Sequence, residues 1–254
     1  MITAIDLGLI FGLMALGVYL TFRVLDFADL TIDGSFTSGA ATAATLIVAG
    51  WQPLTATLAG TAVGLVAGLV TGLLNTWGKI HPLLAGILTQ IALYSINLRI
   101  MGKANVPLLR TTTLFTPLRD KGLLGTWVSV GILAALLAVF VAALVWFLST
   151  DIGLALRATG DNEGMARAQG VNTDAMTLLG LSLSNGLVAL SGALFAQYQG
   201  YADIGMGIGL IVAGLASVII GTAIINNGHI WITALAVVCG SIIYRLIIQA
   251  RSEE

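Results

Sequence analysis

The sequence contains very little charge. Only 9% of its 254 residues are charged, whereas soluble globular proteins carry roughly 25%. The 11 basic and 12 acidic residues leave a formal net charge of −1, and no basic patch indicates nucleic-acid binding. Hydrophobic residues make up 57% of the chain and its mean hydropathy is +0.99. Because so little charge cannot cover a water-exposed surface, we expect an integral membrane protein.

Residues that bind metals or form disulfides are also scarce. Cys239 is the only cysteine, which excludes an intramolecular disulfide and a cysteine-rich metal site. His81 and His229 lie far apart in the sequence, so no zinc ligand set is visible. The chain also lacks the P-loop, serine-hydrolase and metalloprotease motifs. We therefore predict no catalysis, no metal and no cofactor, and any dependence on ATP must come from a partner.

Long apolar runs follow one another along the whole chain. A membrane-spanning helix needs about 20 apolar residues. The expected fold is an all-α polytopic bundle of about eight transmembrane helices, forming one permease-like domain over residues 1–254. The second and seventh runs are short and rich in glycine, so either could be a half-helix or a re-entrant segment. The expected spans are residues 3–22, 34–50, 53–76, 80–101, 125–148, 175–198, 207–225 and 229–249.

Charge is concentrated in one internal segment, LRATGDNEGMARAQGVNTD, which covers residues 156–174. Thr159 or Asp161 can cap the N-terminus of a short helix. Arg167 would lie near the C-terminus of that helix, and Gly170 fits the position after it. The pattern predicts a water-exposed helix of about nine residues. Such a helix is either an ordinary polar loop element or a docking element for a soluble partner.

Four segments of the chain resemble a known family. GLALRATGDNEGMARAQGVNTD is similar to the cytoplasmic loop of ABC-importer permeases related to the branched-chain amino acid permeases. RVLDFADLTIDGSFTSGAA, GLASVIIGTAI and VVCGSIIYRLII resemble one branch of that group, the tryptophan/tyrosine-type permeases. The resemblance covers most of the chain. It implies the permease subunit of a prokaryotic ABC importer in the cell membrane, carrying a small solute that would be an amino acid, and from the branch an aromatic one.

The resemblance also implies partners and an orientation. The partners are an ABC ATPase subunit, an extracytoplasmic solute-binding protein, a second permease copy in a homodimer, and the lipid bilayer. The segment 150–173 would be cytoplasmic, with a coupling helix at about residues 161–170 that fits a cleft of the ATPase. Residues 102–124 would lie outside, and residues 23–34 would lie inside or dip into the bilayer. The residues assigned to ATPase coupling are Arg157, Asp161, Asn162, Glu163, Met165, Arg167 and Gly170.

Polar side chains within the expected spans indicate where a solute could pass, because such groups usually face a bundle interior or a cavity. Gln90, Tyr94 and Asn97 are spaced to share one helix face. At Asp33 the chain is expected to start a helix whose N–H groups could bind an anionic solute group. Interhelical hydrogen bonds and a plain N-cap at the membrane surface are the alternatives at these two places. The candidate path residues are Asp33, Ser35, Gln90, Tyr94, Asn97, Ser182 and Asn185.

A stand-alone secondary transporter of a small polar solute is the alternative function. Such proteins often contain broken helices and intramembrane acids. Asp33 is the only internal acid that fits this description well. A charged cytoplasmic helix has no evident use without a soluble partner, which favours the importer subunit.

Overall fold

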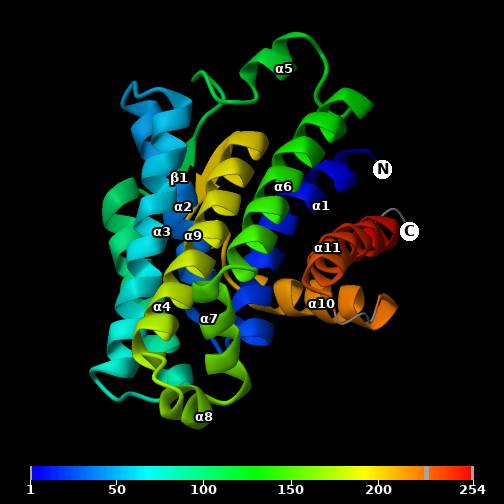
Figure 1. Ribbon diagram of the computed structural model, residues 1–254. Coiled ribbons are helices and arrows are strands. Elements are labelled where there is room, and N and C mark those ends of the chain that lie inside the picture. Colours follow the sequence, from blue (N-terminus) through cyan, green and yellow to red (C-terminus); the bar gives the residue numbers. More distant parts are fainter. Residues whose placement is uncertain (1, 226–228, 253–254) are drawn as a thin grey trace.

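The computed structural model describes residues 2–225 and 229–252, which are mostly helical. Two strands, β1 (Asn105–Pro107) and β2 (Tyr201–Asp203), form one small antiparallel ladder. These elements confirm the expected all-α polytopic bundle (Figure 1). The helices are α1 (Ile2–Val18), continued by the π-helical turn η1 (Tyr19–Val24), α2 (Thr31–Val48), α3 (Pro53–Thr76), α4 (Pro82–Met101), α5 (Thr116–Asp120), α6 (Trp127–Leu148), α7 (Asp151–Asp161), α8 (Glu163–Ala168), α9 (Thr173–Gln199), α10 (Leu210–Ile224) and α11 (Ile230–Ser252).

Six helices of the described chain are long and apolar enough to cross a membrane. They are Ile2–Val24, Pro53–Thr76, Pro82–Met101, Trp127–Leu148, Thr173–Gln199 and Ile230–Ala250, and they match six of the eight expected spans.

The other two expected spans correspond to α2 and α10. Small polar residues lower the hydropathy of α2, and this helix is buried by protein over most of its length. With 15 residues, α10 is about 22 Å long, shorter than the hydrocarbon core of about 30 Å. Its length therefore fits the half-helix that its glycine content made possible.

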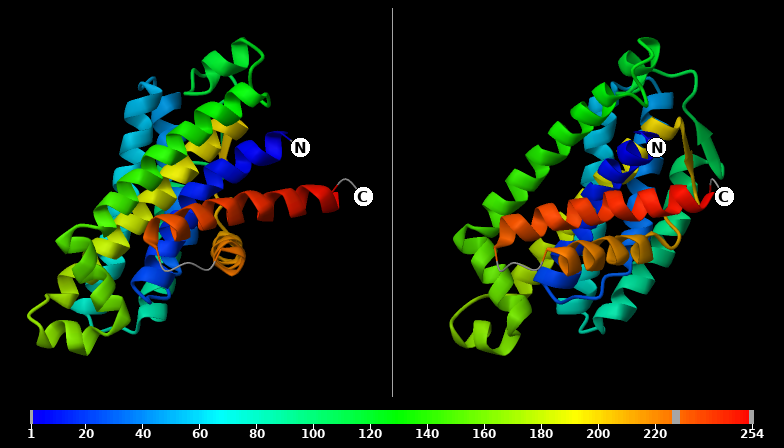
Figure 2. Two further views of the ribbon diagram at one scale, coloured as in Figure 1. Left: turned by 45° about the vertical axis from the view of Figure 1, so that its right-hand side comes forward. Right: turned by 90° about the vertical axis from the view of Figure 1, so that its right-hand side faces the viewer.

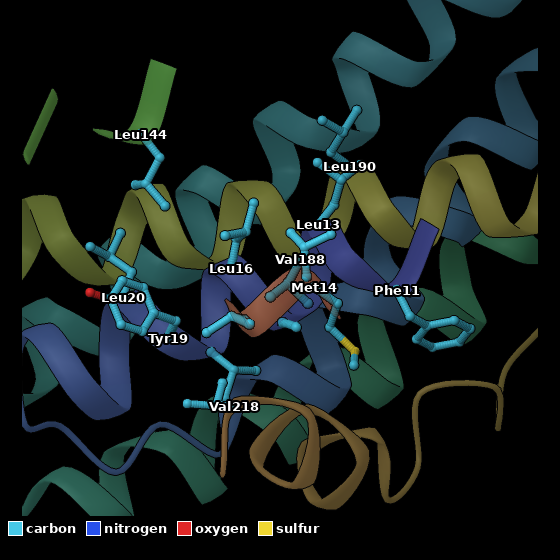
Figure 3. Packing of buried hydrophobic residues seen from close by; sticks show 14 of the residues in the cluster. Phe11, Leu13, Met14, Leu16, Tyr19, Leu20, Leu144, Val188, Leu190 and Val218 are labelled. Carbon is cyan, nitrogen blue, oxygen red and sulfur yellow. The ribbon is translucent and has the colours of Figure 1, made fainter. Parts of the chain in front are cut away.

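The first span forms the centre of the molecule. Every residue from Gly8 to Leu20 is buried, so α1 faces protein on all sides. Leu13 and Leu16 of α1 pack with Val188 and Leu190 of α9 (Figure 3). The helices α6, α10 and α11 add to the same apolar cluster.

Glycines allow the inner helices to approach closely. A Cβ atom at Gly64 or Gly68 of α3 would overlap the backbone oxygen of Asn185 or Leu181 in α9. Gly39 of α2 lies equally close to the backbone of Ala189. The helix pairs α3–α9 and α2–α9 are accordingly in extensive contact. Such contact through small residues is how helices associate in a bilayer, where burial of apolar surface adds little.

Two long connecting segments lie at opposite ends of the bundle. One end carries β1 and α5, and the other carries α7 and α8 (Figure 1). Residues 102–124 and 149–174 are therefore separated by the length of the bundle, as the expected orientation requires. The helices α10 and α11 lie across the direction of α6 and α9 (Figure 2).

Candidate functional site

The charged segment forms two helices instead of the single helix that was expected. At Asn162 the backbone is extended (φ −159°, ψ 96°), which separates α7 from α8. The N-cap of α8 is Asn162, whose Oδ1 accepts a hydrogen bond of 2.9 Å from the Met165 N–H. The assignment of Thr159 or Asp161 as the cap was therefore wrong, because both residues lie inside α7. Gly170 follows the end of α8 with φ +87°, as the sequence predicted.

A charged network ties α8 to the start of α9. Arg167 Nη2 donates to Glu163 Oε1 and to Asp174 Oδ1, each at 2.9 Å. The same nitrogen donates to Thr173 Oγ1 at 2.6 Å. All three charged side chains are more than half exposed, so each pair contributes only about 0–1 kcal/mol. The network therefore sets the position of α8 more than it stabilises the fold.

A polar cavity of about 510 Å³ lies beside this network. Its walls come from the loop after η1, the turn between α3 and α4, and the α7–α9 region. Charged and ionisable groups line it, namely Asp26, Lys79, His81, Glu163, Arg167 and Asp174.

The structure distributes the assigned coupling residues over this end of the bundle. Glu163 and Arg167 line the polar cavity. Arg157 is half-buried in α7, and the remaining residues are exposed. Those exposed residues are Asp161, Asn162, Met165 and Gly170. Thr173 and Asp174 were not among the predicted coupling residues, although both lie at the end of the charged segment 156–174.

A second cavity, of about 410 Å³, collects four of the candidate path residues. It lies between α2, α4 and the segment that precedes α10. Gln90, Tyr94 and Asn97 share one face of α4, as their spacing predicts, and Asp33 joins them from α2. We call this space the solute cavity, and its lining is Asp33, Gly34, Thr37, Gln90, Ile91, Tyr94, Asn97, Ile204 and Ile208.

Asp33 caps a helix other than its own. It lies in the first turn of α2, which begins at Thr31. Its two carboxylate oxygens accept hydrogen bonds from the N–H groups of Gly209 and Ile211, both at 2.8 Å. The helix N-terminus at the solute cavity is therefore that of α10, and Asp33 already occupies it. The helix start expected at Asp33 lies two residues earlier, at Thr31, whose N–H donates to Asp29 Oδ1 at 2.9 Å.

The other three candidate path residues lie outside the lining of the solute cavity and join helices. Ser35 Oγ donates to Asn185 Oδ1 at 2.6 Å, and Asn185 Nδ2 donates to Asp29 Oδ2 at 2.7 Å. Ser182 Oγ donates to the Leu65 carbonyl at 2.8 Å. These bonds join α2, α3 and α9, whereas the sequence offered interhelical bonding as an alternative only for Gln90, Tyr94 and Asn97. Asp29 was not predicted, because its burial depends on the loop before α2 folding inward.

Comparison with known proteins identifies a family match for the chain. The family model described as "Branched-chain amino acid transport system / permease component" matches residues 1–252. No solved structure matches the chain.

Several curated proteins are similar to the chain. A tyrosine transport system permease protein of Clostridioides difficile is 43% identical over 249 residues, covering 97% of this chain and 81% of the relative. An uncharacterised protein of Rickettsia prowazekii is 36% identical over 229 residues, covering 89% of this chain and 78% of the relative. An autoinducer 2 import system permease protein of Photorhabdus laumondii is 32% identical over 96 residues, covering 37% of this chain and 29% of the relative.

These relatives are transport permeases wherever they carry a functional name. With six helices able to cross a membrane, the chain is a multi-pass membrane protein. It belongs to the family of permease components of branched-chain amino acid transport systems.

Proposed function

We propose that this chain is the membrane-spanning subunit of an ABC importer in a prokaryotic cell membrane. Residues 1–254 would act as one permease domain that carries an amino acid across the bilayer. A separate ATPase subunit would drive the cycle, and an extracytoplasmic binding protein would deliver the solute. An aromatic amino acid is favoured because the relative that is 43% identical is named a tyrosine transport permease.

The α8 helix is the observation that carries this proposal. It protrudes at one end of the bundle, and its residues Glu163, Gly164 and Met165 are exposed. Met165 is 64% exposed although it is apolar, which suits contact with a groove on a soluble partner. The Arg167 network fixes the direction in which α8 points, and a stand-alone transporter would not need such an element.

A continuous path of contacts runs from α8 to the solute cavity. Arg167 joins α8 to Asp174 in the first turn of α9. Further along α9, Asn185 accepts a hydrogen bond from Ser35 of α2. Asp33, two residues before Ser35, lines the solute cavity and caps α10. Displacement of α8 by closing ATPase subunits would therefore move the cavity walls through α9 and α2.

A second permease copy would complete the solute cavity. Ile91 and Tyr94 line the cavity but are 63% and 48% exposed, so its mouth opens on the outer face of α4. In a homodimer, the same face of the partner copy would cover this mouth. The path residues would be Asp33, Gln90, Tyr94 and Asn97, while Ser35, Ser182 and Asn185 hold the helices around them.

Co-purification and reconstitution test the proposal. The tagged chain is expressed together with any P-loop ATPase and any secreted binding protein that neighbouring genes encode. We expect a stable complex with the ATPase, and uptake into proteoliposomes that needs ATP. If no ATPase co-purifies, and uptake persists without ATP but stops when the proton gradient is dissipated, the chain is a secondary transporter.

A further inference from the structure

An apolar groove of about 270 Å³ lies between α3, α6 and α9. Its lining runs from Phe140 to Phe147 on α6 and from Leu183 to Leu190 on α9. On both helices the lining positions are the first residue and those three, four and seven residues later, which places them on one face of each helix. Seven residues of helix rise about 10 Å, so the groove follows the two helices for about 10 Å.

The groove exists because α6 stands apart from the helices opposite it. The backbone of α6 is in close contact with α1, α7 and α11, whereas among the described helices its close contact with α3 or α9 is slight or missing. Leu137 and Val141 of α6 are buried in the apolar cluster around α1. α6 is therefore held by α1 on one side, and the groove is the space between its other side and α9.

The lining of the groove offers nothing to a polar ligand. Thr61 of α3 is the only polar residue in the described lining, and its hydroxyl already donates to the Thr57 carbonyl at 3.0 Å. Water is not held in an apolar cavity, because a buried water needs two to four polar partners. In another protein an apolar cavity of about 150 Å³ takes up benzene, so this larger groove has room for a longer hydrocarbon.

The groove is also continuous with the membrane-facing surface. Val66, Val139 and Trp146 adjoin lining residues in the sequence, and each is at least 60% exposed. Phe147 lies one residue before the end of α6, so one end of the groove lies at the α7 and α8 end of the bundle. A helix of a second copy would be too thick, because 10 Å of helix with a diameter of 10–12 Å fills roughly 800–1,100 Å³.

From these observations we propose that the groove binds one acyl chain of a phospholipid from the leaflet on the α7 and α8 side. The acyl chain fills the space between α6 and α9 and supplies the packing that these helices do not make directly. A lipid held in this way stays on the protein when bulk lipid is removed. The groove shares no lining residue with the solute cavity, so this proposal is independent of the proposed function.

Binding to the full chain, delipidated in cholate, tests the proposal, since cholate has no linear chain that competes. Palmitoyl lysophosphatidylcholine, with one acyl chain, is the probe, and glycerophosphocholine, with the same headgroup and no chain, is the comparison. Native mass spectrometry should show saturable binding of about one probe molecule per chain. The probe should also raise the melting temperature, because a ligand that binds only the folded state stabilises it. Glycerophosphocholine should do neither.

Two variants that fill the groove locate the site. Ala143→Trp on α6 and Leu187→Trp on α9 add volume to the lining from opposite sides. Each should lower probe affinity about tenfold or more, since each methylene group excluded from an apolar site lowers affinity several-fold. Val139→Trp, about one turn before Ala143 and outside the lining, is the matched control and should leave the affinity unchanged. Agreement between the two filling variants guards against a folding defect in either one.

Four results would overturn the proposal. Three are the absence of saturable probe binding, equal binding of the probe and glycerophosphocholine, and unchanged probe affinity in both filling variants. The fourth is loss of a dimer in Ala143→Trp with unchanged probe affinity, which would make the groove a contact between two copies. The proposed function fails in a different way, through the absence of an ATPase in the purified complex, whichever lipid binds.

Discussion

At the scale of single residues, buried polar groups in this protein mostly bond across helices. Asp6 is fully buried in α1, and its Oδ2 accepts hydrogen bonds from Ser129 of α6 and Tyr198 of α9. Ser35 and Asn185 join α2 to α9 in the same manner. Arg167 differs because it is exposed and bonds three neighbours at the end of the bundle. Buried bonds hold the helices together, whereas the exposed network sets the position of one small helix.

Replacement of Arg167 should separate these two roles. Arg167→Gln removes both exposed ion pairs, so the free energy of unfolding should fall by no more than about 2 kcal/mol. ATP-driven uptake should fall strongly while ATPase activity persists, because α8 no longer moves α9. Parallel measurements of uptake, ATP hydrolysis and melting temperature check this expectation. Arg99→Gln, at the exposed end of α4, is the matched control, and normal uptake by Arg167→Gln would contradict the coupling role.

At the scale of elements, α10 depends on α2 for its start. Gly209 precedes α10 with φ +81°, and the Asp33 carboxylate accepts both cap hydrogen bonds from the backbone of this turn. A Cβ atom at Gly207 would overlap the Asp33 carbonyl and the Thr37 hydroxyl, so the segment before α10 lies directly on α2. The short helix is thus held at its N-terminal end by one carboxylate and one close backbone contact.

Loss of the Asp33 carboxylate should loosen the first turn of α10. Asp33→Ala removes the cap, which costs about 0.5–2 kcal/mol. Hydrogen exchange of the amides at residues 209–213 should become faster as a result. Ser217→Ala, which removes a hydroxyl bonded within α10, is the control and should leave these amides unchanged. Equal protection in Asp33→Ala and the unmodified protein would show that the cap does not hold α10.

Close contact between α3 and α9 should be sensitive to added volume. A side chain at Gly68 meets the Leu181 backbone, whereas a Cβ atom at Gly131 of α6 has no atom within 4 Å. We therefore expect Gly68→Val to lower the melting temperature in detergent, with a penalty of at least about 1–3 kcal/mol. Gly131→Val should leave the melting temperature nearly unchanged. Similar melting temperatures for the two variants would argue against contact-driven packing of α3 on α9.

At the scale of the whole molecule, the outer surface of the bundle carries many exposed apolar side chains. On α4 they include Leu84, Leu88 and Ile91, each more than half exposed, and on α6 they include Val139. Lipid covers most of such a surface in a membrane protein. The solute cavity opens on the α4 face. We therefore place the proposed second copy on the α4 face.

Cysteine cross-linking should locate the dimer contact. In a Cys239→Ser background, which removes the only native thiol, Ile91→Cys should form a cross-linked dimer with a short bifunctional maleimide. Val139→Cys, equally exposed on α6, should not. Denaturing gels of membranes that still support uptake provide the measurement. Cross-linking at Val139 and not at Ile91 would place the contact on another face.

The sequence by itself determined the class of this protein and the helices that form it. A charge content of 9% excludes a soluble surface, and helix-length apolar runs must satisfy their backbone groups internally, so six spans could be predicted within a few residues. Helical spacing likewise placed Gln90, Tyr94 and Asn97 on one face.

Contacts between segments distant in the chain were decided only by the tertiary structure. Asp33 caps a helix that begins 177 residues later, at Leu210, and Asp29 bonds Asn185, because the folded bundle brings these residues together. Side-chain hydrogen bonds reach only about 3 Å, and no local pattern of residues encodes which distant group will lie within that distance.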